Sequence, residues 1–413
     1  MKKKNVVVIG AGIVGSCCAL RMACEGYSVT LLDNLKPGNG CSFGNAGGIS
    51  SASIIPMAIP GIWKKVPAWL FDSDGPLSVR WRHLLKVSPW LLRWIMESGE
   101  DRSTYSSKAL KDLNHDVLNQ YKKMLGTVNF NNLIRTTGHL HVFKQKPSSK
   151  GDFFVKRIRE EAGICFEEFF DRDVNVVEPS LSKEVKYAIL INDASYTVSP
   201  HRLVNTLVEA FEEMGGNFVQ DHAKEVVASE YGVKVITRLS ALEADYVVIC
   251  AGALSKELMK KDLSKVKLEN ERGYHVNLVS PNFMPSFPIV SGDYKFFSTP
   301  MEDGLRLAGT VEISGLRALP DWSRADILLR NAKRIFPDLS ASGSEVWFGD
   351  RPSFPSSIPL IDVSPVHENI FYAFGHGHYG MSGAPGTAEI IANMIKGKPQ
   401  KVDISPFSYS KHI

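Results

Sequence analysis

Three glycines near the N-terminus have the spacing of a site that binds a dinucleotide. Gly10, Gly12 and Gly15 follow the apolar run 6–9 as GxGxxG, and a second apolar run further along the chain ends at Asp33. Gly10 allows a tight turn after the strand, Gly12 lets the backbone approach a pyrophosphate, and Gly15 lets the helix pack on the sheet. A carboxylate at Asp33 suits the hydroxyl groups of a ribose and repels a 2′-phosphate.

A βαβ unit is needed to hold these residues. Residues 4–33 read KNVVVIGAGIVGSCCALRMACEGYSVTLLD, which predicts a buried strand, a helix that opens at the glycines, and a second strand. The pyrophosphate would lie at the helix N-terminus, where unpaired N–H groups and the helix dipole favour negative charge. Lys2, Lys3 and Lys4 imitate the start of a signal peptide, but glycines break the apolar run, so we expect this segment to be retained.

Further glycine-rich segments are predicted to approach the same nucleotide. The loop 34–53, NLKPGNGCSFGNAGGISSAS, is long and rich in small residues, which favours a loop that wraps a cofactor over a surface loop. The run 244–252, ADYVVICAG, predicts a buried parallel strand that ends in a glycine turn beside the first βαβ unit. The run 370–380, IFYAFGHGHYG, predicts a strand, a turn and a helix start whose N–H groups can face an electron-rich ring.

Composition restricts the class of protein. A chain of 413 residues exceeds the usual size of a single core, so two intertwined domains are expected. The net charge of +4 is too small to indicate nucleic-acid binding. The six cysteines form no CxxC pair, which favours reduced thiols and a cytoplasmic protein. The chain has no apolar run of about 18 residues, so no transmembrane helix is predicted.

The segment 56–98 has a composition of its own. It combines lysines and arginines with five of the seven tryptophans, namely Trp63, Trp69, Trp81, Trp90 and Trp94. Such a mixture is typical of a segment in a membrane interface, and it would place the protein peripherally on the inner face of the plasma membrane. Clustered aromatic residues are also ordinary core material, and core packing is the slightly favoured interpretation.

The remaining segments predict alternating helices and strands. Apolar positions recur at three- and four-residue spacing over 103–125, which predicts one amphipathic helix. A second helix is predicted over 200–214, and strand-like pieces over 265–339 favour an antiparallel sheet. His139 and His141 share one face of a predicted strand. We interpret them as structural histidines, because a third metal ligand is absent from the nearby sequence.

Several motifs together are far more specific than the N-terminal glycines. They are VVVIGAGIVG at 6–15, GNAGGIS at 44–50, VSPHRL at 198–203, VVICAGALS at 247–255, RGYHV at 272–276, GLRLAGTVE at 304–312, DRPSFPSSIPLI at 350–361 and GHGHYGMSGAPG at 375–386. With them the chain resembles, over nearly its whole length, the FAD-dependent amino-acid oxidoreductases of the D-amino-acid oxidase superfamily. It resembles most closely the bacterial D-amino-acid dehydrogenases of the small-subunit type.

The resemblance implies an α/β fold with two domains. One is a Rossmann-type FAD-binding domain, similar to that of glutathione reductase, and the other is an α+β substrate domain on a mixed or antiparallel sheet. The FAD-binding domain is expected to be discontinuous, with residues 1–60, 195–264 and 345–413. Residues 61–194 and 265–344 are expected to form the substrate-binding domain.

The resemblance also implies the cofactor contacts. FAD is expected to bind non-covalently, because this chain has no cysteine after Cys250 and has Asn45 where some relatives carry a histidine that tethers flavin. The implied FAD contacts are Ile9, Gly10, Ala11, Gly12, Ile13, Val14, Gly15, Asp33, Asn34, Ser42, Asn45, Ala46, Gly47, Gly48, Ile49, Val226, Ala251, Gly252, Arg351, Gly377, His378, Tyr379, Gly380, Met381 and Ser382.

A carboxylate clamp is expected at Arg351, because a guanidinium binds a planar carboxylate through two hydrogen bonds. The alternative is a structural ion pair between Arg351 and Asp350. Candidates for the pocket wall, each with packing as the alternative, are Tyr274, His275, His378 and Tyr379. Two departures from the family's C-terminal signature, Ser356 and Asp362, leave the exact substrate open.

The expected reaction transfers a hydride from the carbon that bears a neutral amine to flavin, and the imine product then hydrolyses. Substrates would be D-amino acids or cyclic imino acids similar to D-proline or hydroxyproline, with electrons passed to a quinone or another carrier. The alternatives are an amine oxidase of the glycine or sarcosine type that uses O₂, and a non-catalytic flavin-binding subunit of a complex. An NAD-dependent dehydrogenase would fit residues 4–33 but leaves the turn at 375–386 unexplained.

Overall fold

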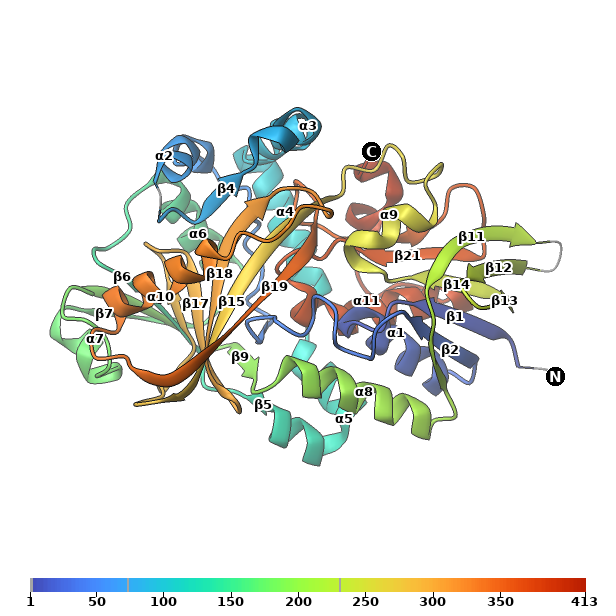
Figure 1. Ribbon diagram of the computed structural model, residues 1–413, viewed down its shortest axis with the longest axis horizontal. Coiled ribbons are helices and arrows are strands. Elements are labelled where there is room, and N and C mark those ends of the chain that lie inside the picture. Colours follow the sequence, from blue (N-terminus) through green and yellow to red (C-terminus); the bar gives the residue numbers. More distant parts are fainter. Residues whose placement is uncertain (1–2, 73, 230–231) are drawn as a thin grey trace.

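The computed structural model describes residues 3–72, 74–229 and 232–413. Two sheets lie side by side, and both chain ends belong to the part of the molecule that holds the parallel sheet (Figure 1). This arrangement confirms the predicted α/β fold class, with a nucleotide-type sheet beside a mixed, mainly antiparallel sheet.

The parallel sheet has the strand order β10-β2-β1-β14-β21-β20. Its strands are β1 (Asn5–Ile9), β2 (Ser28–Asp33), β10 (Asn217–Gln220), β14 (Tyr246–Ile249), β20 (Leu360–Val363) and β21 (Ile370–Phe374). All neighbouring strands are parallel except β20, which runs antiparallel to β21. Since these strands come from three distant segments of the chain, the sheet is built discontinuously.

Both faces of the parallel sheet are covered. Val6 and Val8 pack in one core with helices α1 (Ile13–Cys24), α8 (Pro200–Glu213) and α11 (Gly380–Lys396). Val7 and Ile9 pack on the opposite face, in a core shared with β11 (Ala223–Ser229), β12 (Gly232–Thr237), β13 (Ala241–Ala244) and α9 (Ser255–Leu258). A strand buried on both faces reads as an unbroken apolar run, which explains the run at 6–9.

The larger sheet has the order β19-β15-β18-β17-β16-β6-β8-β7, and β4 pairs with β18. Its strands are β4 (Leu77–Val79), β6 (His139–Phe143), β7 (Phe166–Phe170), β8 (Tyr187–Ile191), β15 (Glu269–Pro281), β16 (Ile289–Ser291), β17 (Phe296–Met301), β18 (Gly304–Ile313) and β19 (Ala341–Ser353). The pairs β16–β6 and β18–β4 are parallel and the others are antiparallel. A small sheet of β3 (Gly48–Ser50), β9 (Ala194–Thr197) and β5 (Ile134–Arg135) lies between the two parts.

The other helices are α2 (Val66–Phe71), α3 (Trp81–Glu97), α6 (Lys150–Glu161), α7 (Arg172–Val177) and α10 (Ser323–Ile335), with short 3₁₀ turns at 62–64, 252–254, 405–407 and 409–411. Helix α8 confirms the helix predicted over 200–214, and the Ser199 hydroxyl caps its first turn. None of the helices among the described residues is long and apolar enough to cross a bilayer.

The single helix predicted over 103–125 is wrong. The chain forms α4 (Glu100–Leu113) and α5 (Val117–Leu133), which are separated at Asp116, a residue with a left-handed φ of 56°. The apolar spacing continues across the break, so the pattern alone did not reveal it. Leu113 and Tyr121 pack in the same core as α1 and α11.

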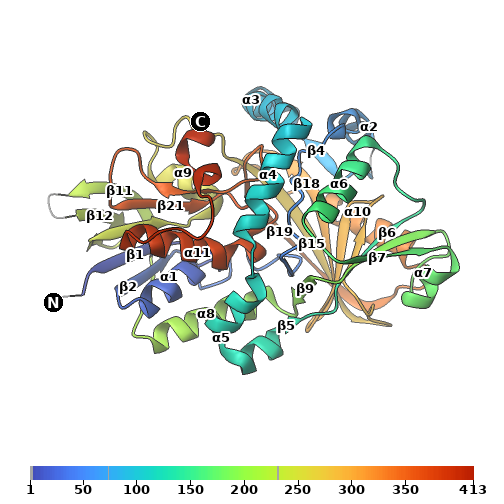
Figure 2. The ribbon, with the colours of Figure 1, turned by 180° about the vertical axis from the view of Figure 1, so that it is seen from behind.

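The predicted domain boundaries do not follow the sheets everywhere. Strand β19 spans the expected boundary at 344/345, and it lies wholly in the larger sheet. Helices α4 and α5 come from the expected substrate segment 61–194 but pack beside α1 and α11 (Figure 2). The exact boundaries of the two domains therefore stay a prediction.

The preferred core packing of the tryptophan-rich segment is confirmed for part of it, because Trp90 and Trp94 belong to one packed cluster. Trp90 is buried, but Trp81 is 77% exposed and Trp63 is 48% exposed. Trp69 and Trp94 are partly buried. The segment therefore has two tryptophans that pack inward and two that are exposed at the surface.

Candidate functional site

The glycines of the first turn are required by close backbone contacts. Gly10 has a φ of 110°, and a Cβ there would lie 2.4 Å from the carbonyl oxygen of Cys250. A Cβ at Gly15 would lie 1.7 Å from the carbonyl oxygen of Gly10. By contrast, the space around Gly12 is open except for the Ser42 hydroxyl at 3.2 Å. The turn is therefore tight on its inner side and leaves room for a ligand at Gly12.

Asp33 lies at the end of β2, beside the glycine turn. Its carboxylate accepts hydrogen bonds from the backbone N–H groups of Ala11 at 2.6 Å and Leu35 at 2.9 Å. Burial raises the pKa of this carboxyl group, although the backbone donors oppose the shift. The predicted ribose acceptor is thus next to the predicted pyrophosphate turn.

The loop 34–53 folds back over the N-terminus of α1. Gly12 is the N-cap of that helix and offers no side chain, while the Ser42 hydroxyl accepts a hydrogen bond from the Ile13 N–H at 3.0 Å. The backbone turns at 250–252 lie against the same place, since Ala251 Cα is 3.1 Å from the Cβ position of Gly10. Val226 of β11 packs in one core with Ile9.

The same loop is bound to the larger sheet through its backbone carbonyls. Arg306 donates to the carbonyl oxygens of Phe43 at 3.1 Å and Asn45 at 3.0 Å, and the Thr299 hydroxyl donates to Ala46 at 2.8 Å. Sequence reasoning missed both donors, although Arg306 lies inside the motif at 304–312. The loop therefore joins the two sheets through fixed contacts.

The loop has an internal turn of its own. The Asn45 side-chain oxygen accepts from the Gly47 N–H at 2.8 Å, and Gly47 has a φ of 80°. Gly48 and Ile49 then begin β3, where Ile49 is fully buried. The segment predicted to lie beside the cofactor is thus held in one conformation.

The second glycine-rich turn meets the first. Helix α11 begins at Gly380, and its N-cap residue, Tyr379, contributes no side-chain hydrogen bond to the first turn. The hypothetical Cβ of Gly380 is 3.9 Å from the Ile13 side chain, and the Ser382 hydroxyl accepts from the Ser50 N–H at 3.1 Å. Two helix N-termini without acidic residues in the first turn therefore converge beside the loop 42–49.

Strands β15 and β19 present two different faces. Glu271 lies directly opposite Arg351, and His275 lies opposite Trp347, so these four side chains share one face. The guanidinium of Arg351 lies over Gly273, where a Cβ would be 2.0 Å from Nη2. This face points toward the loop, because His275 Nδ1 donates to the Gly44 carbonyl at 3.1 Å.

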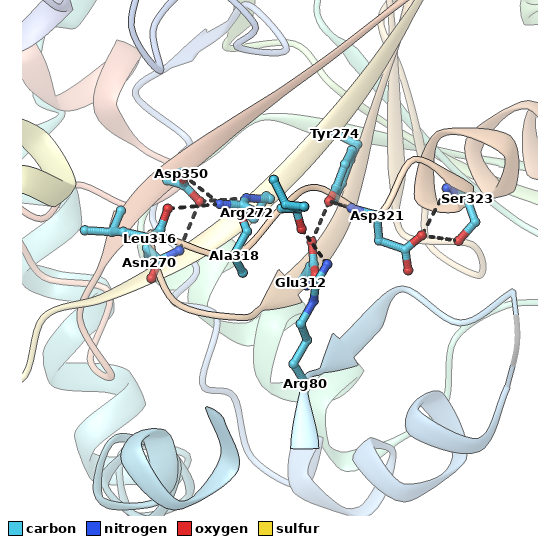
Figure 3. Close-up of polar contacts among 11 residues, drawn as sticks. Arg80, Asn270, Arg272, Tyr274, Glu312, Leu316, Ala318, Asp321, Ser323 and Asp350 are labelled. Carbon is cyan, nitrogen blue, oxygen red and sulfur yellow. Dashed lines mark hydrogen bonds and ion pairs between the residues drawn. The ribbon is translucent and has the colours of Figure 1, made fainter. Parts of the chain in front are cut away.

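Tyr274 points to the other face, which corrects its prediction as a pocket residue. Its hydroxyl donates to Glu312 and accepts from the Asp321 N–H at 2.7 Å (Figure 3). On the same face, Asp350 pairs with Arg272 at 3.0 Å. Because side chains alternate along a strand, the neighbour of His275 cannot share its environment.

The contacts of Asp350 also exclude the alternative for Arg351. Among the described residues, no carboxylate lies within 4.0 Å of the Arg351 guanidinium, and its one hydrogen bond, to the Thr310 carbonyl, is 3.5 Å long. Asp350 is bound to Arg272 on the opposite face. A structural pair between Arg351 and Asp350 is therefore wrong, and the guanidinium has donors available for a ligand.

A small pocket lies between this face and the second turn. Its lining includes Glu271, Ser353, His378, Tyr379 and, from α3, Trp94. Glu271 accepts from the Ser353 hydroxyl at 3.0 Å and lies 3.6 Å from His378 Nδ1. Sequence reasoning missed Glu271, whose only signal was its position beside the motif RGYHV.

Burial sets the protonation states in this pocket. It raises the pKa of Glu271, partly opposed by Ser353 and Arg351, and it lowers the pKa of His378 to about 3, with help from the charge of Arg351. His378 Nδ1 is buried without a hydrogen-bond partner among the described residues. The pocket therefore combines a basic carboxylate and an unpaired ring nitrogen, and Arg351 lies opposite Glu271 on the neighbouring strand. Such groups call for a ligand.

His139 fits the structural interpretation. The His139 ring is buried and contacts the Ser195 carbonyl through Nε2 at 2.8 Å, and burial lowers its pKa to about 4. Within the described part of the chain, no group of three or more potential ligands is placed to hold a metal ion.

The residues present fit FAD. The open space at Gly12 and the acceptor Asp33 suit a long cofactor with a pyrophosphate and an electron-rich ring. The N-termini of α1 and α11 suit it as well, because neither N-cap residue makes a side-chain hydrogen bond to its helix. The family model of FAD dependent oxidoreductases, DAO, matches residues 5–394, so the chain belongs to this family. It is therefore a flavin-dependent oxidoreductase, as the sequence motifs predicted.

Similar proteins extend over the whole chain. A D-amino-acid oxidase of Bradyrhizobium diazoefficiens is 35% identical and covers 99% of both chains. A D-amino acid dehydrogenase of Vibrio atlanticus is 28% identical, over 99% of this chain and 100% of the relative. Two solved structures share the fold. Glycine oxidase from Geobacillus kaustophilus has a TM-score of 0.75 and 17% identity, and the match covers both chains in full. L-proline dehydrogenase from P. horikoshii has a TM-score of 0.76 and 18% identity, and the match covers 98% of this chain and 97% of that one.

Proposed function

We propose that this protein oxidises D-amino acids or cyclic imino acids with non-covalently bound FAD. The observation that carries the proposal is the buried face on which Arg351, without a carboxylate partner among the described residues, lies opposite Glu271 at the edge of the second flavin turn. An amino acid carries one carboxylate and one amine, so a cation and a carboxylate on one strand pair suit its two ends. The names of the relatives support this substrate class.

In the proposed reaction, bound FAD supplies a two-electron acceptor for the hydride that leaves the α-carbon. Arg351 binds the substrate carboxylate through two hydrogen bonds and so fixes which face of the α-carbon is exposed. Glu271 accepts a proton from the ammonium group, because burial raises the pKa of its carboxyl group and so makes the carboxylate a stronger base. The α-carbon of the neutral amine can then lose the hydride. Water converts the imine of an acyclic amino acid to a 2-oxo acid and ammonia, and it opens the cyclic imine of an imino acid to an amino-2-oxo acid without release of ammonia.

His378 and Tyr379 form the wall of the proposed substrate site. His378 is neutral at neutral pH, so its ring adds no positive charge beside Arg351. The Tyr379 hydroxyl donates to the Ile55 carbonyl, which fixes the ring. His275 has a different role in this proposal, since it stacks on Trp347 with ring centroids 5.2 Å apart and supports the loop at Gly44.

We also propose that electrons leave through a quinone or another carrier and that the protein meets the inner face of the plasma membrane. An oxidase that uses O₂ is the second candidate, because the relative with 35% identity is named a D-amino-acid oxidase. A non-catalytic subunit is disfavoured by the unpaired Arg351.

Anaerobic absorption spectroscopy tests the proposed function. D- and L-amino acids and cyclic amino acids are added in turn to the purified flavoprotein. Bleaching of the flavin bands by D-amino or cyclic imino acids is the expected result, and slow recolouring in air together with rapid recolouring by a soluble quinone would identify a dehydrogenase. Immediate recolouring in air with peroxide formation would favour the oxidase, and flavin that no amino acid bleaches would contradict the proposal.

A further inference from the structure

Exposed apolar side chains are concentrated in one short segment. Of 25 exposed large hydrophobic residues in the described part of the chain, 10 lie between 57 and 96. The most exposed are Phe71 at 91%, Leu85 at 88% and Trp81 at 77%. Since monomeric proteins seldom expose such clusters without a function, this surface requires a partner.

Helix α3 has two apolar faces. Val87 and Trp90 face inward and pack on Ile313 of β18. Residues advance by about 100° along a helix, so the exposed apolar residues of α3 fall within about one third of its circumference. They are Trp81, Leu84, Leu85, Leu92, Ile95 and Met96. This continuous outer face is not explained by the packing of the helix on the sheet.

Helix α2 extends the same surface. Leu70 and Phe71 are exposed on α2, and Trp63 is exposed in the turn before it. Both helices lie along one edge of the molecule in two opposite views, with β4 between them (Figures 1 and 2). We call the exposed residues of Trp63–Met96 on these two helices the α2–α3 face.

Positive charge borders the α2–α3 face. Arg82 and Lys86 lie on α3 beside the apolar stripe, and Lys64 and Lys65 precede α2. Lys64 lies over the Trp63 ring at 5.7 Å, and Arg82 lies over the Trp81 ring at 5.2 Å. Of the two acidic residues in this stretch, Asp74 is already paired with Arg330 and Arg334. The free charge of the face is therefore positive.

This combination selects a lipid surface over a protein surface. Apolar side chains on two separate helices can enter the acyl region, tryptophan rings suit headgroup depth, and lysine or arginine reaches anionic phosphates. We propose that the α2–α3 face docks in the interface of a bilayer that contains anionic phospholipid.

The docked helix also reaches the candidate active site. Trp90 Nε1 donates to the Ser353 carbonyl at 3.2 Å, and Trp94 lines the pocket that contains Glu271 and His378. At the other end, Arg80 pairs with Glu312, which holds the start of α3 on the larger sheet (Figure 3). Together with the proposed function, on which this point rests, docking of the α2–α3 face would place the candidate site next to an electron acceptor dissolved in the membrane.

Co-sedimentation with vesicles tests the docking. The FAD-loaded protein is mixed at low salt with vesicles of phosphatidylcholine and phosphatidylglycerol, or of phosphatidylcholine alone. The natural chain is expected to bind the anionic vesicles, and Phe71→Glu with Leu85→Glu should weaken binding by at least about tenfold. Leu239→Glu is the matched control, because Leu239 is 79% exposed outside this face.

Several outcomes would overturn the proposal. The natural chain could fail to bind anionic vesicles, or the double variant could bind them as well as the natural chain does. The natural chain could also bind vesicles of phosphatidylcholine alone as well as it binds the anionic vesicles. A dimer in sedimentation velocity that the double variant dissociates, without vesicle binding, would assign the face to a second copy of the chain. Anaerobic flavin reduction in solution should not change in the double variant. Vesicle binding without flavin reduction by any amino acid would therefore refute the proposed function and leave the docking intact.

Discussion

Glu271 and Arg351 lie directly opposite each other on β15 and β19, and Glu271 lines the pocket beside the second glycine-rich turn. Gly273 makes this possible, since its missing side chain gives the guanidinium its place. A cation and a carboxylate are thus held on one rigid strand pair without forming a close ion pair, which leaves both available to a zwitterionic substrate.

Replacement of Arg351 by leucine should raise KM for the amino acid by about 10- to 100-fold, because a charge-assisted pair with the carboxylate is lost. Arg351→Lys should recover only part of the affinity, since lysine lacks the planar fork. Steady-state kinetics with a soluble acceptor measures both. An unchanged KM in Arg351→Leu would remove this residue from the carboxylate clamp.

Replacement of Glu271 by glutamine should lower kcat and remove one limb of the pH profile. In the natural protein the carboxylate must be ionised to take the proton, and burial raises its pKa, so the rate should rise with pH through that raised pKa. Glu345→Gln, exposed on the neighbouring strand β19 and outside the pocket lining, is the control. A pH profile that keeps its acid limb in Glu271→Gln would refute the role.

Replacement of Gly12 by alanine should weaken FAD binding by about tenfold or more while the protein still folds. The new methyl group meets only the Ser42 hydroxyl at 3.2 Å, but it occupies the space predicted for the pyrophosphate. Flavin fluorescence during titration of the apoprotein gives the dissociation constant. Gly343→Ala, where no atom lies within 4 Å, is the matched control, and equal affinity in both variants would count against the site.

Replacement of Tyr274 by phenylalanine should lower the free energy of unfolding by about 1–3 kcal/mol, because the buried Glu312 loses a donor. Substrate KM should stay the same, since the ring points away from the pocket. Denaturant unfolding and steady-state kinetics measure the two effects. A large change in KM with unchanged stability would restore Tyr274 to the substrate site.

Acidification should destabilise the fold before most carboxylates titrate. Burial lowers the pKa of His139 and His275 to about 4 and of His376 and His378 to about 3, so the unfolded chain binds these protons first. Their contribution is complete above about pH 6.5 and is lost as the pH falls toward these folded-state values. The raised pKa values of Asp33 and Glu271 act in the opposite direction.

Denaturant unfolding between about pH 6.5 and pH 5 measures this loss, which we expect to be on the order of 1 kcal/mol per histidine. His376→Gln removes one titrating group and should flatten the slope. Replacement of exposed His115 should leave the slope as it is. A free energy of unfolding that stays constant over this range would contradict the buried neutral state of these rings.

The sequence alone determined the parts of the site that depend on local backbone geometry. Gly10 and Gly15 lie in a turn whose close backbone contacts leave no room for a Cβ, so their spacing between a buried strand and a helix predicted the turn. The positions of Asp33 and of the helix capped by Ser199 could be predicted for the same reason, because the end of a strand and the cap of a helix depend on only a few neighbouring residues.

Tertiary structure decided what each side chain faces. Tyr274 and His275 are neighbours in the motif RGYHV, yet only strand pairing places one in the buried polar network and the other toward the loop. Glu271 became a site residue, and Trp81 a surface residue, for the same reason. Residue type and spacing fix local conformation, but the environment of a side chain depends on segments that are distant in sequence and meet it only in the folded chain.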